Sequence, residues 1–345
     1  MKKLLAMSMG MALAATSAFA FAACGENDAN KDKNPNTEVV KVEYYMPDGA
    51  PALSMAKMMH EASDSSSYHV VEASTIKTYV TGEAPKADVC VLPLNLASNL
   101  LGTGETYQML GTVTHGNLYM LSTNDSVKYE TGESLSGLIG KKVGVIQLAN
   151  VPGLTFKAIL NDNNIAWQEM NADTPYDETK VNLIGIADPA TGVSPATGYD
   201  VYVAAEPLVS VKTANTSLKE VGDLQALYGG ENGYPQAVVV AKSSFIAENV
   251  EWVNDFVEKT MPAAAEWLKE AEAETVISAI ASCLPTGQTP TFNAKNLTKD
   301  VISRCGIRFV SAKDSKAEVN AFLAKLIEIN PKAAKTVSDA FFYGA

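Results

Sequence analysis

The sequence contains few of the residues that build metal centres and covalent active sites. It has only three histidines, four cysteines and two arginines among 345 residues. The histidines, His60, His69 and His115, lie far apart, with no paired carboxylate or cysteine spacing, which argues against a metal site. No Gly-x-Ser-x-Gly elbow and no His-Glu-x-x-His motif occurs. We therefore expect no catalytic residue, no metal and no cofactor.

A phosphate-binding loop is also missing. The only Gly-Lys pair, Gly140-Lys141, has Leu135 where such a loop needs glycine and Lys142 where it needs serine or threonine. We therefore expect that the protein does not itself hydrolyse ATP.

The first 23 residues have the pattern of an export signal. Lys2 and Lys3 precede an uncharged apolar run that ends with small residues directly before Cys24. This end resembles a bacterial lipobox, which implies that Cys24 is lipidated and anchors the protein to the extracytoplasmic face of the cell membrane. Residues 24–37 are charged, polar and proline-containing, as expected of a flexible tether. A plain secretory signal or a membrane helix is the alternative, but no basic stop-transfer flank follows the run.

The rest of the chain is acidic. The formal net charge of −12 becomes −14 without residues 1–23, because that segment contains two lysines and no acidic residue. This charge argues against a nucleic-acid partner. Of the remaining cysteines, Cys90 lies in an apolar strand, and Cys283 and Cys305 could pair or remain reduced. We favour the absence of a disulfide.

Strand and helix patterns alternate along the chain and predict an α/β fold. Strands are expected at 39–46, 68–73, 88–92, 110–122 with an interruption at 114–116, 142–146, 181–186, 200–205 and 237–242. A helix is expected at 94–101, another from Leu154, and two helical stripes lie after residue 250. The length suggests two lobes, 38–122 with 235–345 and 123–234, joined by crossings near residues 122 and 235. A ligand would lie in the cleft between them.

Residues 141–160 form the most informative unit. A β-branched run, a polar turn with Pro152 and Gly153, and an amphipathic segment predict strand, loop and helix. Unpaired backbone N–H groups at such a helix start point into the crevice of an open α/β sheet. The alternative is an ordinary connection that touches no ligand.

Several segments together resemble a known family. The end of the signal at Cys24, the turn at 47–51, the strand at 88–93, the unit at 141–160 and the step from Asp200 to Glu206-Pro207 resemble the solute-binding lipoproteins of ABC importers. More narrowly, they are similar to the group that binds nitrate, taurine, aliphatic sulfonates and thiamine-pyrimidine precursors. The resemblance implies a type II periplasmic-binding-protein fold, with two α/β lobes joined by a two-segment hinge. It also implies capture of a small polar or heteroaromatic solute and its delivery to a membrane permease with an ATPase subunit.

Carried over position by position, the resemblance implies a set of ligand-binding residues: Asp48, Gly49, Ala50, Thr75, Lys77, Asn95, Thr114, His115, Gln147, Asn150, Pro152, Gly153, Leu154 and Glu206. For Glu206 we favour the alternative of a helix-capping carboxylate. A structural role for His115 is at least as well supported as ligand contact.

The sequence departs from oxyanion-binding proteins that clamp their ligand with arginine. Arg304 and Arg308 lie near the C-terminal end, and we expect both to be away from every predicted cleft loop. An anion could sit on helix N-termini with Lys77 as a point charge. Alternatively, Asp48, Asp188 and Glu206 could face an amino-substituted ring.

An enzyme on the same scaffold is the rival interpretation. A pyrimidine-synthesising family that resembles these proteins binds pyridoxal phosphate and iron. That chemistry needs a Schiff-base lysine, clustered histidines and a cysteine-rich motif, none of which can be placed in this sequence. The resemblance therefore favours a non-catalytic receptor.

The lipobox generates the first testable prediction. Cys24→Ser should release the protein from the membrane fraction or leave it as unprocessed precursor, because the lipid chains supply the membrane affinity. Metabolic labelling with a radioactive fatty acid and membrane fractionation measure this. Unchanged lipid labelling of the variant would contradict the prediction.

Overall fold

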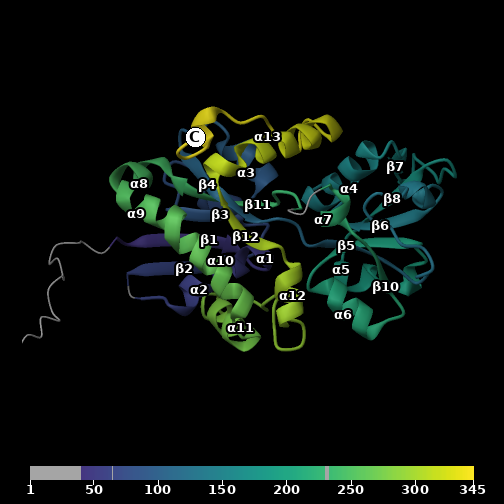
Figure 1. Ribbon diagram of the computed structural model, residues 1–345, viewed down its shortest axis with the longest axis horizontal. Coiled ribbons are helices and arrows are strands. Elements are labelled where there is room, and N and C mark those ends of the chain that lie inside the picture. The colour runs from purple at the N-terminus through teal and green to yellow at the C-terminus, as the bar shows by residue number, and fades with distance from the viewer. Residues whose placement is uncertain (1–39, 64, 230–232) are drawn as a thin grey trace, which may run out of the picture. The chain divides into compact units, whose positions relative to one another are not determined.

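The computed structural model describes residues 40–63, 65–229 and 233–345. The expected signal peptide, the tether and Cys24 lie outside the described residues. The described chain contains two six-stranded sheets, each covered by helices (Figure 1). In this part of the chain, no helix is both long enough and apolar enough to span a membrane.

The first sheet is mixed. In spatial order it consists of β12 (Ile307–Ser311), β4 (Tyr107–Thr114), β11 (Ala237–Lys242), β3 (Val89–Pro93), β1 (Val42–Pro47) and β2 (Ser66–Val71). β1, β2 and β3 are parallel, whereas β11 runs antiparallel to both β3 and β4. β3 is continuously apolar because β1 and β11 flank it and helices cover its faces. The prediction that strand 237–242 returns to the first sheet is confirmed.

The second sheet consists of β10 (Lys219–Asp223), β5 (Leu118–Ser122), β9 (Val201–Ala205), β6 (Lys142–Ile146), β8 (Val181–Ile186) and β7 (Trp167–Glu169). β9, β6, β8 and β7 are parallel, and β5 and β10 complete the sheet in antiparallel pairings. The prediction of one strand over 110–122 is wrong, because β4 and β5 belong to different sheets. The first crossing is therefore at residues 115–117 and not after residue 122. We call the described residues of 40–114 and 237–345 the first lobe, and 118–229 the second lobe.

The helices lie mainly between consecutive strands. In the first lobe they are α1 (Ala50–Leu53), α2 (Ala56–His60), α3 (Leu94–Leu101), α8 (Ser243–Glu248), α9 (Val250–Asp255), α10 (Met261–Glu270), α11 (Ala273–Ser282), α12 (Lys299–Arg304) and α13 (Ala312–Ile329). In the second lobe they are α4 (Val151–Asp162), α5 (Pro189–Gly192), α6 (Leu208–Asn215) and α7 (Leu224–Leu227). Short 3₁₀ turns occur at Ile76–Tyr79, Leu135–Leu138, Pro195–Thr197 and Asp339–Phe341, and a π-helical turn joins α9 to α10 at Phe256–Thr260.

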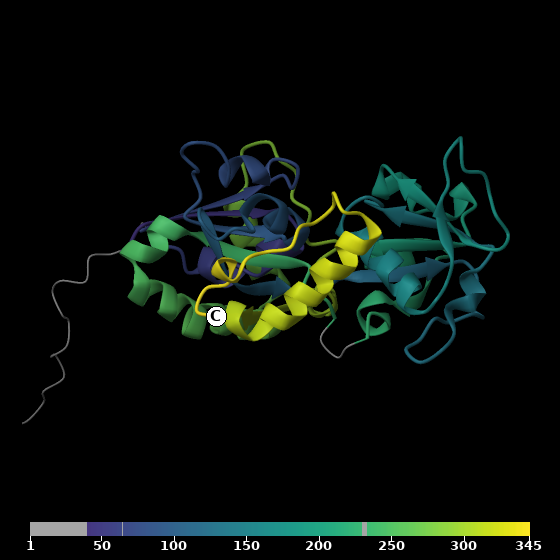
Figure 2. The same ribbon diagram turned by 90° about the horizontal axis from the view of Figure 1, so that it is seen from above.

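The core follows the apolar stripes of the sequence. As expected, α13 ends before Asn330-Pro331, and its buried face includes Phe322 and Leu326. It packs against β4 of the first lobe and α4 of the second (Figure 2). Cys90, Cys283 and Cys305 are all free thiols.

The crossing segments pack closely against a third passage of the chain. Gly116 and Gly306 both have positive φ angles, of 94° and 61°. A Cβ atom on Gly306 would lie 2.3 Å from the carbonyl oxygen of Gly116. Gly306 is therefore required both by its positive φ angle and because a larger residue would clash with the Gly116 backbone.

Burial of the central strand of the second sheet generates a stability prediction. Val145 of β6 is fully buried between β8 and β9. Val145→Asp should lower the free energy of unfolding by about 3–5 kcal/mol, because it places an unpaired carboxylate in the core. Val127→Asp is the matched control: Val127 is 41% exposed, and its change should stay within about 0.5 kcal/mol. Equal denaturant midpoints for the two variants would contradict this account.

Candidate functional site

A cavity of about 470 Å³ lies against the two crossing segments. Its walls come from the segments that follow β1, β2 and β3 in the first lobe and β6 in the second, and from Thr114, Gln236 and Ala237 at the crossings. These segments begin at the carboxyl ends of parallel strands, where ligands bind in open α/β sheets. We call this cavity the cleft.

Six of the expected ligand-binding residues line the cleft: Lys77, Asn95, Thr114, Gln147, Asn150 and Pro152. They come from four separate stretches of the sequence and both lobes. The fold therefore brings together residues that the sequence places up to 75 positions apart, counting from Lys77 to Pro152.

The loop from β6 to α4 is held in place by hydrogen bonds to its own backbone carbonyls, which come from a loop amide and from a buried lysine of α4. Gln147 has a positive φ of 46°, and its carbonyl accepts a hydrogen bond of 2.8 Å from the Asn150 amide. The Lys157 ammonium, which is buried, donates to the Leu148 carbonyl at 3.2 Å and to Glu169 Oε1 at 2.5 Å. Lys157 thus ties the loop to α4, a role that sequence reasoning missed because the lysine lies within an apolar helix.

Gly153 supports this loop and does not line the cleft. The helix expected from Leu154 begins at Val151, so Gly153 lies in its first turn with an ordinary φ. A Cβ atom at Gly153 would lie 2.1 Å from the Leu148 carbonyl oxygen. Glycine is needed because the loop passes directly over it. Leu154 is buried in the core.

Two helices begin at the cleft without a side-chain cap. The N-cap residues are Pro93 for α3 and Asn150 for α4, both line the cleft, and neither makes a side-chain capping hydrogen bond. The first N–H groups of a helix lack partners within it and carry a partial positive charge. Among the described residues that line the cleft, Lys77 is the only charged one. The electrostatic character of the cleft is therefore positive.

Two buried polar atoms in the wall of the cleft have no hydrogen-bond partner in the described structure. They are Thr114 Oγ1 and Gln236 Oε1, and both residues line the cleft. Sequence reasoning did not select Gln236, although its place directly after the second crossing was a usable signal. Burying a polar group without a partner costs free energy, so these atoms favour a polar ligand.

The acidic residues expected at the ligand are engaged elsewhere. Asp48 accepts hydrogen bonds of 2.8 Å from the amides of Gly49 and Thr291. Asp188 caps α5 through the Ala190 amide at 2.9 Å. Glu206 accepts hydrogen bonds from Ser210 at the start of α6, which agrees with the helix-capping alternative. None of the three carboxylates lines the cleft.

The other expected residues stabilise the loops around the cleft. Gly49, with a φ of 101°, precedes α1, and Ala50 is buried in the core of the first lobe. The Thr75 hydroxyl donates to the Glu72 carbonyl at 2.8 Å, and Thr75 itself precedes a 3₁₀ turn.

His115 faces a second cavity and not the cleft. Its Nδ1 accepts a hydrogen bond of 2.8 Å from Arg308 Nη2. Burial, together with the positive charge of Arg308, lowers the pKa of His115 to about 3, so the ring is neutral at physiological pH. The expectation that both arginines lie away from every predicted cleft loop is wrong, because Arg308 contacts His115 and Arg304 pairs with Glu206. Neither arginine lines the cleft.

Similar folds occur among solved structures of transport proteins. An ABC transporter structure from Parabacteroides distasonis superposes with a TM-score of 0.66 at 18% identity, over 88% of this chain and 99% of that one. The periplasmic aliphatic sulphonate binding protein SsuA from Escherichia coli gives 0.60 at 14% identity, over 88% and 92%. The alkanesulfonate-binding protein SsuA from Xanthomonas axonopodis pv. citri, bound to MOPS, gives 0.53 at 15%, over 88% and 97%.

This protein has the type II periplasmic-binding-protein fold. The expected fold class is thereby confirmed. At these identities the likeness establishes the fold alone. No protein-family profile and no curated protein sequence matches the chain.

The close packing at Gly153 generates a prediction about the loop. Gly153→Ala should lower the free energy of unfolding by about 1–3 kcal/mol, because the new methyl group forces the Leu148 backbone away from α4. Gly185→Ala is the matched control, since its Cβ would meet only the Leu148 side chain, at an ordinary 3.7 Å. Chemical unfolding of both variants measures the difference. A wild-type midpoint for Gly153→Ala would show that the loop is not held against the helix.

Proposed function

We infer that this protein is the extracytoplasmic solute-binding component of an ABC importer. It captures a small solute in the cleft and delivers it to a permease with an ATPase subunit. The observation that carries this proposal is the cleft itself. Both lobes line it, two uncapped helices begin there, and Lys77 is the one charged residue in the part of its wall that the structure describes. Similar folds in sulfonate-binding proteins of importers support the same role.

The chemistry of the cleft favours a solute with one small anionic group, such as a sulfonate or another oxyanion. The helix N-termini and Lys77 attract negative charge without an arginine clamp. Asn95, Gln147 and Asn150 offer neutral hydrogen-bonding groups for the rest of the solute. An amino-substituted ring fits less well, because the carboxylates that would accept its hydrogen bonds do not line the cleft. A cavity of this volume is of the size that small-molecule ligands occupy.

The location of the protein follows from the same proposal. We infer a lipid anchor at Cys24, a tether over residues 24–37 and two lobes beyond it, so that the cleft faces the space outside the cell membrane. Binding and release of a solute there need no chemical conversion. No observation favours the pyrimidine-synthase-like alternative.

A ligand screen tests the proposal. Thermal melting with taurine, ethanesulfonate, nitrate and an aminopyrimidine should single out an anionic solute. A ligand at 100 times its dissociation constant adds about 2.7 kcal/mol to the free energy of unfolding. Calorimetric titration should then show that Lys77→Gln weakens binding about tenfold or more, because a charge-assisted hydrogen bond is lost. Gln147→Ala and Asn150→Ala should each weaken it by only several-fold, as expected for neutral hydrogen bonds.

Lys86→Gln is the control for this experiment. Lys86 is an exposed lysine of the same lobe that does not line the cleft, so its variant should bind as the wild type does. Equal losses of affinity for Lys77→Gln and Lys86→Gln would indicate a general charge effect and remove the cleft from the proposal. Recovery of a converted product after incubation with protein alone would overturn the receptor function.

A further inference from the structure

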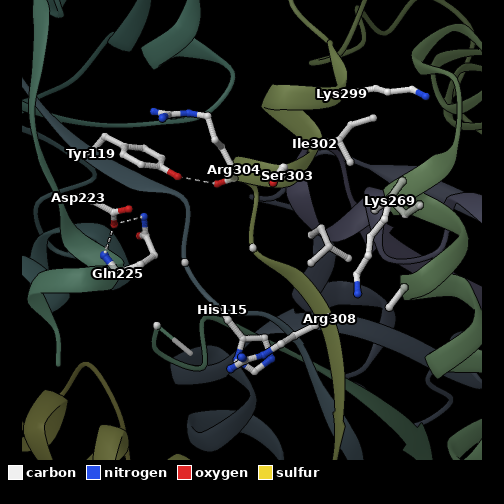
Figure 3. Close-up of a pocket in the computed structure, with 16 residues that line it drawn as sticks. His115, Tyr119, Asp223, Gln225, Lys269, Lys299, Ile302, Ser303, Arg304 and Arg308 are labelled. Carbon is white, nitrogen blue, oxygen red and sulfur yellow. Dashed lines mark hydrogen bonds between the residues drawn. The ribbon is translucent and has the colours of Figure 1, made fainter. Parts of the chain in front are cut away.

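Arg304 connects the two lobes on the far side of the crossing segments. It is the last residue of α12 in the first lobe, and its guanidinium Nε donates to Glu206 Oε1 at 2.5 Å and its Nη2 to Glu220 Oε2 at 2.6 Å. The guanidinium carbon lies 3.8 Å from the centre of the Tyr119 ring. The Tyr119 hydroxyl in turn donates to the Arg304 carbonyl at 3.1 Å (Figure 3). Glu206, Glu220 and Tyr119 all belong to the second lobe.

The pair with Glu206 is the stronger half of this link. The Glu206 side chain is fully buried, and Arg304 is its ionic partner in the described structure. A buried carboxylate that loses its cation pays the full cost of desolvation. Glu220 is 36% exposed, so its bond to Arg304 is weaker and solvent can replace it.

This link and the cleft lie on opposite faces of the first crossing. Thr114 lines the cleft, whereas the next residue, His115, lines a second cavity of about 570 Å³ together with Tyr119 and Arg304. Successive side chains along an extended strand point to opposite faces. Figure 3 shows Arg304 directed towards Tyr119 in this second cavity, with His115 and Arg308 further along it.

The position of Arg304 determines which direction of lobe rotation its contacts oppose. A rotation about the crossings that brings the lobes together at the cleft separates them at the second cavity. The hydrogen bonds of Arg304 then lengthen and break, whereas a rotation in the opposite sense only brings the partners closer. The contact therefore stabilises the less closed arrangement of the lobes.

We propose that Arg304 is a positioning residue that sets the solute affinity of the cleft without contacting the solute. By opposing closure, it lowers the population of the closed state and so weakens apparent binding. This inference rests on the proposed function, because it assumes that closure captures a solute. It assigns Glu206, for which the family resemblance implied ligand contact, to the control of lobe movement.

Two variants remove different parts of the link. Glu220→Gln removes the exposed ion pair and leaves the buried pair intact. The double variant Glu206→Gln with Arg304→Met removes the buried carboxylate together with its cation and keeps an apolar side chain over Tyr119. The carboxylate that it leaves without a cation is Glu220, which is 36% exposed and can be solvated. Lys242→Met is the control: it cuts the 3.2 Å pair with Asp88, which is similarly exposed but lies within the first lobe.

The affinity measured by calorimetric titration should rise. With the solute from the screen, Glu220→Gln should bind about two- to fivefold tighter and the double variant about tenfold tighter or more, with Lys242→Met unchanged. Damage to the fold would weaken binding, so tighter binding together with a lower melting temperature separates the two causes. Unchanged or weaker binding by a cooperatively folded Glu220→Gln variant would overturn the proposal, and this variant decides if the double variant does not fold.

Small-angle X-ray scattering without any solute gives an independent readout. Both link variants should have a smaller radius of gyration than the wild type and Lys242→Met, because the closed state becomes more populated. Equal radii for all four proteins would overturn the role of Arg304. If the wild type binds no tested solute, the proposed function fails, but scattering still decides whether Arg304 restrains the lobes.

Discussion

Backbone hydrogen bonds among three passages of the chain are the constraint on which the two-lobed structure depends. The His115 amide donates to the Gly306 carbonyl at 2.9 Å, and the Gln236 amide donates to the Thr114 carbonyl at 2.9 Å. Three stretches of the chain thus form one hydrogen-bonded strip between the sheets, although 121 positions separate His115 from Gln236 and 70 separate Gln236 from Gly306. Positive φ angles at Gly116 and Gly306 allow the passages to approach so closely. Both cavities are built on this strip, one on each face.

The cleft combines a rigid wall with uncommitted polar groups. The loop after β6 is fixed by a buried lysine and by contact with a helical glycine, so little conformational entropy remains to be lost on binding. Its helix, in contrast, begins without a side-chain cap, and Thr114 and Gln236 present polar atoms without partners. The site is therefore ordered before a solute binds, but some of its polar groups still lack hydrogen-bond partners. A solute that brings negative charge to the helix N-terminus and a hydrogen-bond donor to Gln236 Oε1 would complete it.

Local patterns in the sequence were sufficient for most of the regular structure. The expected bounds are found for Lys142–Ile146, Val181–Ile186, Ala237–Lys242 and Leu94–Leu101, because buried strands and amphipathic helices each have a distinct pattern of apolar residues. The short strands β7, β10 and β12 were missed. They lie at sheet edges or contain mostly half-buried and polar residues, so their periodicity is weak. β4 and β5 were merged because both are apolar and only three residues separate them.

The candidate site was harder to predict because its details depend on distant partners. Loops after strands could be located, and several of their residues line the cleft. The capping role of Glu206 was predicted from the local sequence. Its pairing with Arg304 and the contact of His115 with Arg308 could not be predicted, because these partners lie 98 and 193 positions away. Gly153 belongs to the same class, because its constraint comes from the path of a neighbouring loop and not from its own φ angle.

The order of strands in the first sheet has a consequence for the sequence of events during synthesis. β11 lies between β3 and β4, yet it is the last of these three to leave the ribosome. Until residue 242 is made, β3 and β4 have no common neighbour, and the first sheet remains in two pieces. Residues 118–229, in contrast, contain every strand of the second sheet in one uninterrupted stretch. The second lobe can therefore fold during synthesis, before the first lobe is complete. The N-terminal strands can form their full sheet only after β11 has been made.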